Sequence, residues 1–71
     1  MRGTGAILTP RQVQVLELVG AGLSYKQVAV RLNLGHGTIK NHMQHIYGRL
    51  GVRTRIEALL EAHRLKIIKV Y

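Results

Sequence analysis

The stretch SYKQVAVRLNLGHGTIKNHMQ, residues 24–44, decides how this chain folds. It contains two segments with the apolar spacing of helices, joined only by the link NLG, residues 33–35. A link this short makes two successive helices cross steeply instead of lying side by side. Ala29 is small enough for the crossing, and Asn33 tolerates the left-handed backbone that such a turn needs. The pattern predicts a helix-turn-helix, although short links of this kind also occur in other α-helical proteins.

Capping patterns mark where the helices begin. In LTPRQV (residues 8–13) and LSYKQV (residues 23–28), a hydroxyl cap is followed three residues later by Gln, and a Leu before the cap can pack on the Val. TRIE (residues 54–57) repeats the capping box with Glu. We therefore expect one all-α domain over residues 1–71, a four-helix domain with a central helix-turn-helix and helices at about 10–20, 25–32, 36–50 and 55–64. The tail, residues 65–71, stays open between a longer helix, a segment along the core and a strand with a partner.

Composition limits what the chain can do. Its 71 residues include 11 Lys and Arg against three Glu, a formal net charge of +8, and no Cys, Phe or Trp. Disulfides and Cys-based zinc sites are therefore excluded, and the core must be aliphatic. No apolar run reaches the ~18 residues of a membrane span, and the N-terminus lacks the apolar centre of a signal peptide. We expect a cytoplasmic protein with no membrane partner, whose positive charge suits a nucleic acid.

The second helix of the motif separates into an apolar and a polar side at 100° per residue. Its apolar stripe consists of Ile39, Met43, Ile46 and Leu50. The opposite side has Gly37, Asn41, Gln44 and Gly48, with Lys40 and His45 at its margins. Amides pair well with adenine and Lys with guanine, so this side has the groups that read base edges. A merely solvated polar face is the alternative, but two glycines and no acid are an unusual way to build one.

Two glycines at the start of this helix need an explanation, because Gly is a poor helix former. Gly35 fits the N-cap position, which tolerates Gly at little cost. Gly37 would then leave the first turn without a side chain, which permits close approach to a phosphate or base edge at the helix N-terminus. The alternative is a tolerant first turn in which the residue has no consequence.

Together these segments resemble a known family. LTPRQVQVLELVGAGLS, KQVAVRLNL, GTIKNHMQHIYGRLGV and TRIEALLEA, some fifty-five residues, are similar to the LuxR-type (GerE-like) helix-turn-helix domain of bacterial transcription regulators. The resemblance implies a four-helix fold in which the third helix enters the major groove, the second braces it, and the fourth commonly forms a dimer contact. It implies a sequence-specific DNA-binding regulator acting in the bacterial nucleoid, with RNA polymerase as a further partner.

The resemblance also implies roles for individual residues. The residues expected to contact bases are Lys40, Asn41 and Gln44. The residues expected to contact phosphates are Lys26, Thr38, Lys40, Arg49, Arg53 and Arg55. Phosphate contacts would supply affinity, and base contacts would supply discrimination.

The fourth helix offers a surface for a second copy. Ala58 and Ala62 are four residues apart, a small-residue strip that would let another helix approach. We expect a weak homodimer through residues 55–64, with two half-sites about one helical turn of DNA apart. The alternative is that these alanines are simply good helix formers.

Other classes of function fit less well. The chain has no Asp and no paired carboxylates or activated nucleophile, so we expect no enzyme and no cofactor. His42 and His45 are too few for a metal site, and His42 is expected to pack beside the core stripe. A protein-interaction module that heterodimerises through residues 55–64 remains the alternative function, and structured RNA is disfavoured because its major groove is too narrow. The operator, the inducing signal, activation or repression, and an attached receiver or ligand-sensing domain stay open.

Overall fold

The computed structural model describes residues 7–68. It contains four helices, α1 (Pro10–Gly20), α2 (Tyr25–Leu32), α3 (His36–Leu50) and α4 (Arg55–Arg64), and no strand among the described residues. These bounds coincide with the predicted ones. The prediction of an all-α fold with a central helix-turn-helix is confirmed.

The helix starts form as their sequences predict. Thr9, Ser24 and Thr54 each cap a helix with a capping box. The cap side chain accepts a hydrogen bond from the backbone N–H of the residue three positions on, and the side chain of that residue accepts one from the backbone N–H of the cap. Gly35 caps α3 in extended backbone, with φ −74° and ψ 153°, and has no side-chain hydrogen bond to offer. Three helix starts are therefore satisfied by local side chains, and the fourth keeps its first N–H groups available.

The turn between α2 and α3 depends on one left-handed residue. Asn33 adopts φ 57° and ψ 46°, and the Leu34 N–H donates to the Ala29 carbonyl at 2.8 Å. Ala29 itself is buried where the two helices cross. The roles predicted for Ala29 and Asn33 are thus confirmed.

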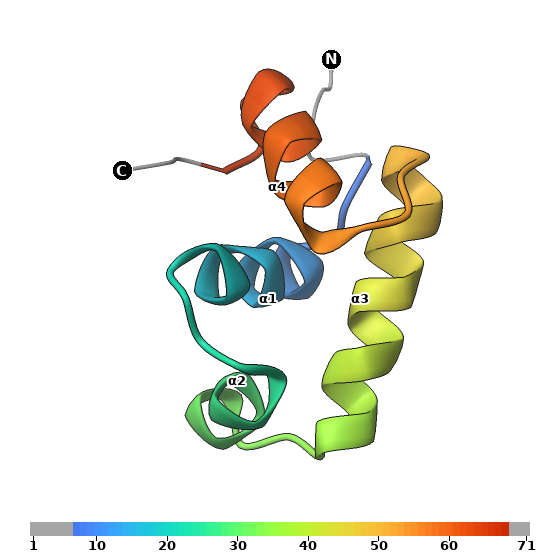
Figure 1. The fold of residues 1–71 in the computed structure, drawn as a ribbon. Helices are drawn as coiled ribbons and strands as arrows, with labels where there is room; N and C mark the ends of the chain where they lie inside the picture. The colour runs from blue at the N-terminus through green and yellow to red at the C-terminus, as the bar shows by residue number, and fades with distance from the viewer. Residues whose placement is uncertain (1–6, 69–71) are drawn as a thin grey trace.

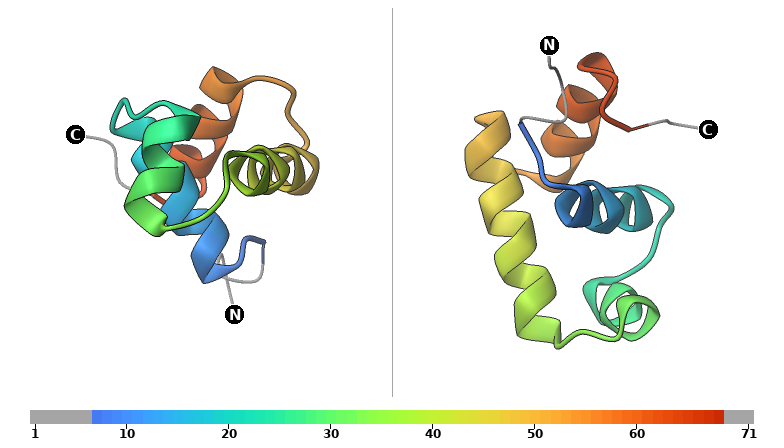
Figure 2. Two further views of the ribbon diagram at one scale, coloured as in Figure 1. Left: turned by 90° about the horizontal axis from the view of Figure 1, so that it is seen from below. Right: turned by 180° about the vertical axis from the view of Figure 1, so that it is seen from behind.

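The helices are arranged around α3, which runs along one side of the molecule (Figure 1). The other three stack beside it, α2 near its N-terminal end, α1 in the middle and α4 near its C-terminal end, and the reverse view agrees (Figure 2). α3 contacts all three. One side of α3 is consequently buried along its length, and the other is free.

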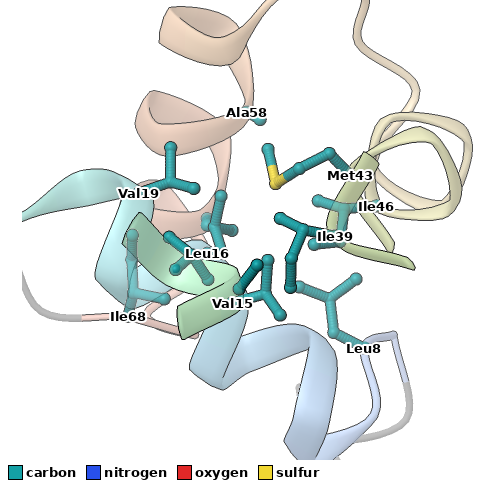
Figure 3. Close-up of a cluster of buried hydrophobic side chains, with 12 residues drawn as sticks. Leu8, Val15, Leu16, Val19, Ile39, Met43, Ile46, Ala58 and Ile68 are labelled. Atoms are coloured by element: carbon teal, nitrogen blue, oxygen red, sulfur yellow. The ribbon is translucent and has the colours of Figure 1, made fainter. Parts of the chain in front are cut away.

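The core is small and aliphatic, as composition predicts (Figure 3). Ile39, Met43 and Ile46 of α3 are fully buried against Val15 and Leu16 of α1. The remaining buried members are Leu8, Val19, Val28, Ala29, Ala58, Ala62 and Ile68. Leu50, expected in the apolar stripe, is partly buried against this cluster.

The C-terminal segment turns back after α4. Lys66 adopts a left-handed φ of 60°, and the Ile67 N–H donates to the Ala62 carbonyl at 2.8 Å. Ile68 then packs in the core. Of the three open paths for the tail, residues 65–68 follow the one along the core, and residues 69–71 lie outside the described part.

The prediction that Ala58 and Ala62 form a surface strip on α4 is wrong. Ala58 and Ala62 are both fully buried, because α4 uses them to approach its own domain closely. The large aliphatic residues on its exposed side are Ile56 and Leu60, which are 67% and 64% exposed. A partner helix would meet those two residues and not the alanines.

Candidate nucleic-acid interface

The free side of α3 presents the three predicted base-reading residues together. Lys40, Asn41 and Gln44 are exposed, whereas the neighbouring Ile39 and Met43 are buried. Within residues 7–68, the structure gives none of the three polar side chains a hydrogen-bond partner. Their amide and ammonium groups therefore face solvent with their hydrogen-bonding capacity unused.

The start of α3 is open in the way the glycines suggest. Gly37 lies in the first turn, and a Cβ atom built on it would meet nothing within 4 Å. At Gly35 the nearest atom would be the Thr38 hydroxyl oxygen at 3.8 Å, an ordinary contact. Neither glycine has a positive φ. The fold of the described residues therefore does not require glycine at either position.

The residues predicted to contact phosphates are exposed. Thr38 is exposed in the first turn of α3, and Lys26 is exposed in the first turn of α2. Arg49 lies near the other end of α3, where its Nε donates to the Ile7 carbonyl at 3.0 Å. Arg53 is exposed in the loop that follows. Thr38 and Arg49 thus lie on α3 near its two ends, whereas Lys26 belongs to α2 and Arg53 to the loop after α3.

Arg55, the remaining predicted contact, belongs to a cluster that the sequence did not reveal. The Tyr25 and Tyr47 hydroxyls lie 3.2 Å apart and share a hydrogen bond. The Arg55 guanidinium lies over the Tyr25 ring, 4.9 Å from its centroid, in a cation–π contact. The Tyr25 ring also lies 6.4 Å from that of His36. One cluster thus joins the starts of α2, α3 and α4.

Burial, followed by the hydrogen bond to Tyr25, raises the pKa of Tyr47 to about 12, although Arg55 acts in the opposite direction. The Tyr47 hydroxyl consequently keeps its proton at neutral pH and remains a donor. Both tyrosines are half-buried, so their rings pack against the domain and are not free to stack on nucleotides.

A shallow hollow of about 370 Å³ opens beside the base-reading row. It is lined by Gln12 of α1 and by Gln44, His45, Gly48 and Arg49 of α3. Gly48 leaves it open, since a Cβ there would meet nothing within 4 Å. The sequence singled out Gly48 on this face, but the approach of α1 that forms the hollow could not be predicted from helical spacing.

The three acids of the chain belong to α1 and α4. Glu57 accepts hydrogen bonds from the N–H groups of Arg53 and Thr54, which hold the pKa of its carboxyl below the ordinary value. Glu61 is paired with Arg64, which lowers the pKa of the Glu61 carboxyl. α2 and α3 contain no acid at all. The exposed side of the helix-turn-helix is therefore purely neutral and cationic, as a polyanion requires.

Other kinds of site find no support in the part of the chain described. Residues 7–68 bring no three His, Cys, Asp or Glu side chains close enough to hold a metal ion. His42 is half-buried beside the core stripe, where it was predicted to pack. None of the described helices combines the length and apolar character that crossing a membrane requires.

Comparison with known proteins agrees with this geometry. Residues 6–62 match the family model described as bacterial regulatory proteins, luxR family. The chain is 42% identical over 53 residues to a probable HTH-type transcriptional regulator, GfsR, of Streptomyces halstedii, covering 75% of this chain and 22% of that protein. It is 35% identical over 60 residues to the nitrate/nitrite response regulator protein NarL of Escherichia coli K12, covering 84% of this chain and 28% of NarL.

One solved structure is matched by this chain over almost the whole length of the solved protein. The structure of the transcription factor GerE superposes with a TM-score of 0.86 at 30% identity, covering 89% of this chain and 94% of GerE. The match therefore concerns the domain, whereas the chain spans less than a third of the two regulators above. The prediction of the family is confirmed. The chain belongs to the luxR family of bacterial regulatory proteins and is a helix-turn-helix DNA-binding domain of that family.

Proposed function

We propose that this domain reads a specific duplex DNA sequence by placing α3 in the major groove. The observation that carries the proposal is the row of Lys40, Asn41 and Gln44, exposed together and without hydrogen-bond partners in the described residues. Asn and Gln bind the N6 and N7 atoms of adenine in two hydrogen bonds, and Lys binds the O6 and N7 atoms of guanine. We therefore expect the site to contain adenines and a guanine where these side chains meet it.

Phosphate contacts would orient α3 in the groove. Lys26 and Thr38 border its N-terminal end, and Lys40 is long enough to serve a phosphate as well as a base. The arginines expected to contact the DNA backbone near the other end are Arg49, Arg53 and Arg55. Such contacts do not depend on base sequence, so they account for affinity and for salt dependence. On the bacterial chromosome, RNA polymerase would be the expected second partner.

We further propose a weak homodimer through the exposed side of α4. Ile56 and Leu60 are four residues apart and both point away from the core, so two copies can pack them across a two-fold axis. Such a dimer would present two copies of α3 to half-sites about 10 base pairs apart. The alanines of α4 take no part in this contact.

Selection from a random duplex library at physiological salt is the direct test. A roughly palindromic site bound at least ~1000-fold more tightly than scrambled DNA would establish a dimeric sequence reader. Weak, salt-sensitive binding without enrichment would contradict it and favour a protein-interaction module.

Single substitutions test the division of roles on the selected site. Asn41→Ala and Gln44→Ala should each cost the preferred site roughly 1–3 kcal/mol and leave scrambled DNA nearly unaffected. Lys26→Ala should weaken both duplexes alike and lower the salt slope by about 1. Equal losses on the two duplexes for all three variants would contradict the assignment.

Cooperativity between half-sites tests the dimer. Leu60→Glu should abolish cooperative binding to a full site and keep binding to a single half-site, because the charge falls at the proposed two-fold contact. Val30→Glu controls for the added charge, since Val30 is 77% exposed on α2 and not on α4. It should keep cooperativity between half-sites even where it lowers the affinity for each half-site. Retained cooperativity in Leu60→Glu would place the dimer contact elsewhere.

A further inference from the structure

We propose that Tyr25, Tyr47 and Arg55 form a preassembled contact for one phosphate of the DNA backbone, beside the base-reading row of α3. This proposal rests on the function proposed above, because it takes α3 to lie in the major groove. It goes further because it assigns a phosphate contact to the two tyrosines. It also attributes the affinity of this contact for a phosphate to the arrangement of the tyrosines with Arg55.

The three side chains come from three helices and meet before DNA arrives. Tyr25 is the first residue of α2, Tyr47 lies in the second half of α3, and Arg55 begins α4. The tyrosine hydroxyls are hydrogen-bonded at 3.2 Å, and the Arg55 guanidinium lies 4.9 Å from the Tyr25 ring centroid. An arginine held in this way has already lost much of its rotamer freedom, so it loses less on binding a phosphate.

The cluster has unused hydrogen-bond donors. Two hydroxyls that share one hydrogen bond use one of their two protons for it, so the second O–H remains to donate to an acceptor. The guanidinium has five N–H donors, more than its hydrogen bond to Tyr47 uses, and no carboxylate in the described part of the chain forms an ion pair with Arg55. A hydroxyl and a guanidinium side by side are well suited to the oxygens of a phosphodiester.

The position of the cluster favours a phosphate and not a base. His36, Lys40 and Tyr47 share one border of α3, because positions four and eleven apart fall on the same side of a helix. This border faces α2 at Tyr25, whose hydroxyl is hydrogen-bonded to that of Tyr47. A helix seated in a groove about 12 Å wide has a sugar-phosphate backbone along each border. The cluster and Lys40 would then follow one DNA strand.

A purely structural tie between helices is the alternative, and the variants separate the two. Tyr47→Phe and Tyr25→Phe remove a hydroxyl and keep each ring, so Arg55 can still stack. Arg55→Gln removes the guanidinium and leaves the tyrosine pair in place. Arg64→Gln is the matched control, because it removes the same charge at the far end of α4, where Arg64 pairs with Glu61. Thermal unfolding of each variant shows whether the fold is kept.

The decisive experiment combines these variants with duplexes in which one phosphate at a time is a neutral methylphosphonate. For the unmodified protein, neutralising one phosphate per half-site should weaken binding about tenfold, as expected for one lost hydrogen bond to a charged group. For folded Arg55→Gln and Tyr47→Phe, the same neutralisation should have a much smaller effect, while Arg64→Gln should behave as the unmodified protein. Equal sensitivity to every phosphate in all four proteins would overturn the proposal and leave sequence reading intact.

Salt dependence provides a measurement that does not need a selected site. Arg55→Gln should lower the salt slope on scrambled duplex by about 1 relative to Arg64→Gln, as expected for one lost phosphate contact. Equal slopes for the two variants would overturn the phosphate site. If no sequence is selected but the slopes differ, the proposed sequence reading fails and the phosphate contact stands.

Discussion

Replacing Gly37 by Ala should make the domain more stable and its DNA binding weaker. Gly37 lies in the first turn of α3, and an added Cβ would meet nothing within 4 Å. Ala in place of Gly in a helix gains about 0.5–1 kcal/mol, partly because the unfolded chain has less freedom to lose. For a chain of 71 residues this gain corresponds to a rise in Tm of roughly 2–8 °C.

The expected loss of binding comes from the contact that the added methyl group would make with DNA. If the first turn of α3 approaches DNA closely, a methyl group at position 37 enters a packed contact, which typically costs about 1–3 kcal/mol. Affinity for the selected duplex should then fall roughly 5- to 150-fold. Opposite signs for stability and binding would locate the need for glycine at the DNA and not in the fold.

Thermal unfolding followed by circular dichroism, together with titration of the selected duplex, measures both quantities. Gly48→Ala is the matched control: its Cβ also meets open space, but it lies 11 residues along α3, or about 16 Å. It should stabilise the fold and affect binding less, because recognition helices contact base edges mainly with their N-terminal residues. A Gly37→Ala domain that is stabilised and binds DNA unchanged would refute the close approach, and a destabilised one would refute the open space.

Three further predictions concern the fold. Met43→Ala should cost about 2–5 kcal/mol, measured by urea unfolding, because Met43 is 1% exposed at the centre of a small core; a loss below 1 kcal/mol would contradict that central role. Lys66→Gly should stabilise the domain by about 0.5–1 kcal/mol in the same assay, since Lys66 holds a left-handed φ of 60°, and an unchanged or lower stability would argue against this turn. Hydrogen bonds from the Arg53 and Thr54 N–H groups lower the pKa of Glu57 below 4.5. The charged carboxylate therefore stabilises the fold at neutral pH, and this stabilisation is lost as the pH falls through the lowered pKa. Glu57→Gln keeps a capping side chain and should flatten the pH dependence of unfolding in acid, whereas an unchanged dependence would assign it to other carboxyls.

The helices of this domain could be predicted because their ends are coded locally. The partners of Thr9, Ser24 and Thr54 are the residues three positions on, so a short window of sequence contains each interaction. The turn before α3 likewise depends on the left-handed conformation of Asn33 alone. The partners in these caps and in this turn lie within five residues of each other, and sequence and structure agree on them.

The tyrosine cluster could not be predicted for the opposite reason. Tyr25 and Tyr47 are 22 positions apart, and their hydrogen bond depends on how far α2 slides along α3. Arg55 reaches the Tyr25 ring only because α4 begins near the first turn of α2. Helical spacing assigns a residue to a side of its own helix, but it contains no information on the axial offset between two helices.

The direction in which α4 packs shows the same limit and has a consequence for assembly. Ala58 and Ala62 form one row along α4, and Ile56 and Leu60 form a second row two positions away, on the opposite side of the helix. Hydrophobicity alone would bury the larger row, yet the smaller one is inside, because a close approach of α4 to the domain leaves no room for larger side chains. The larger row is then left at the surface, where its exposure costs free energy in the isolated domain. A second copy that covers this row would remove that cost, which is why we expect the dimer contact on the side of α4 opposite to the alanines.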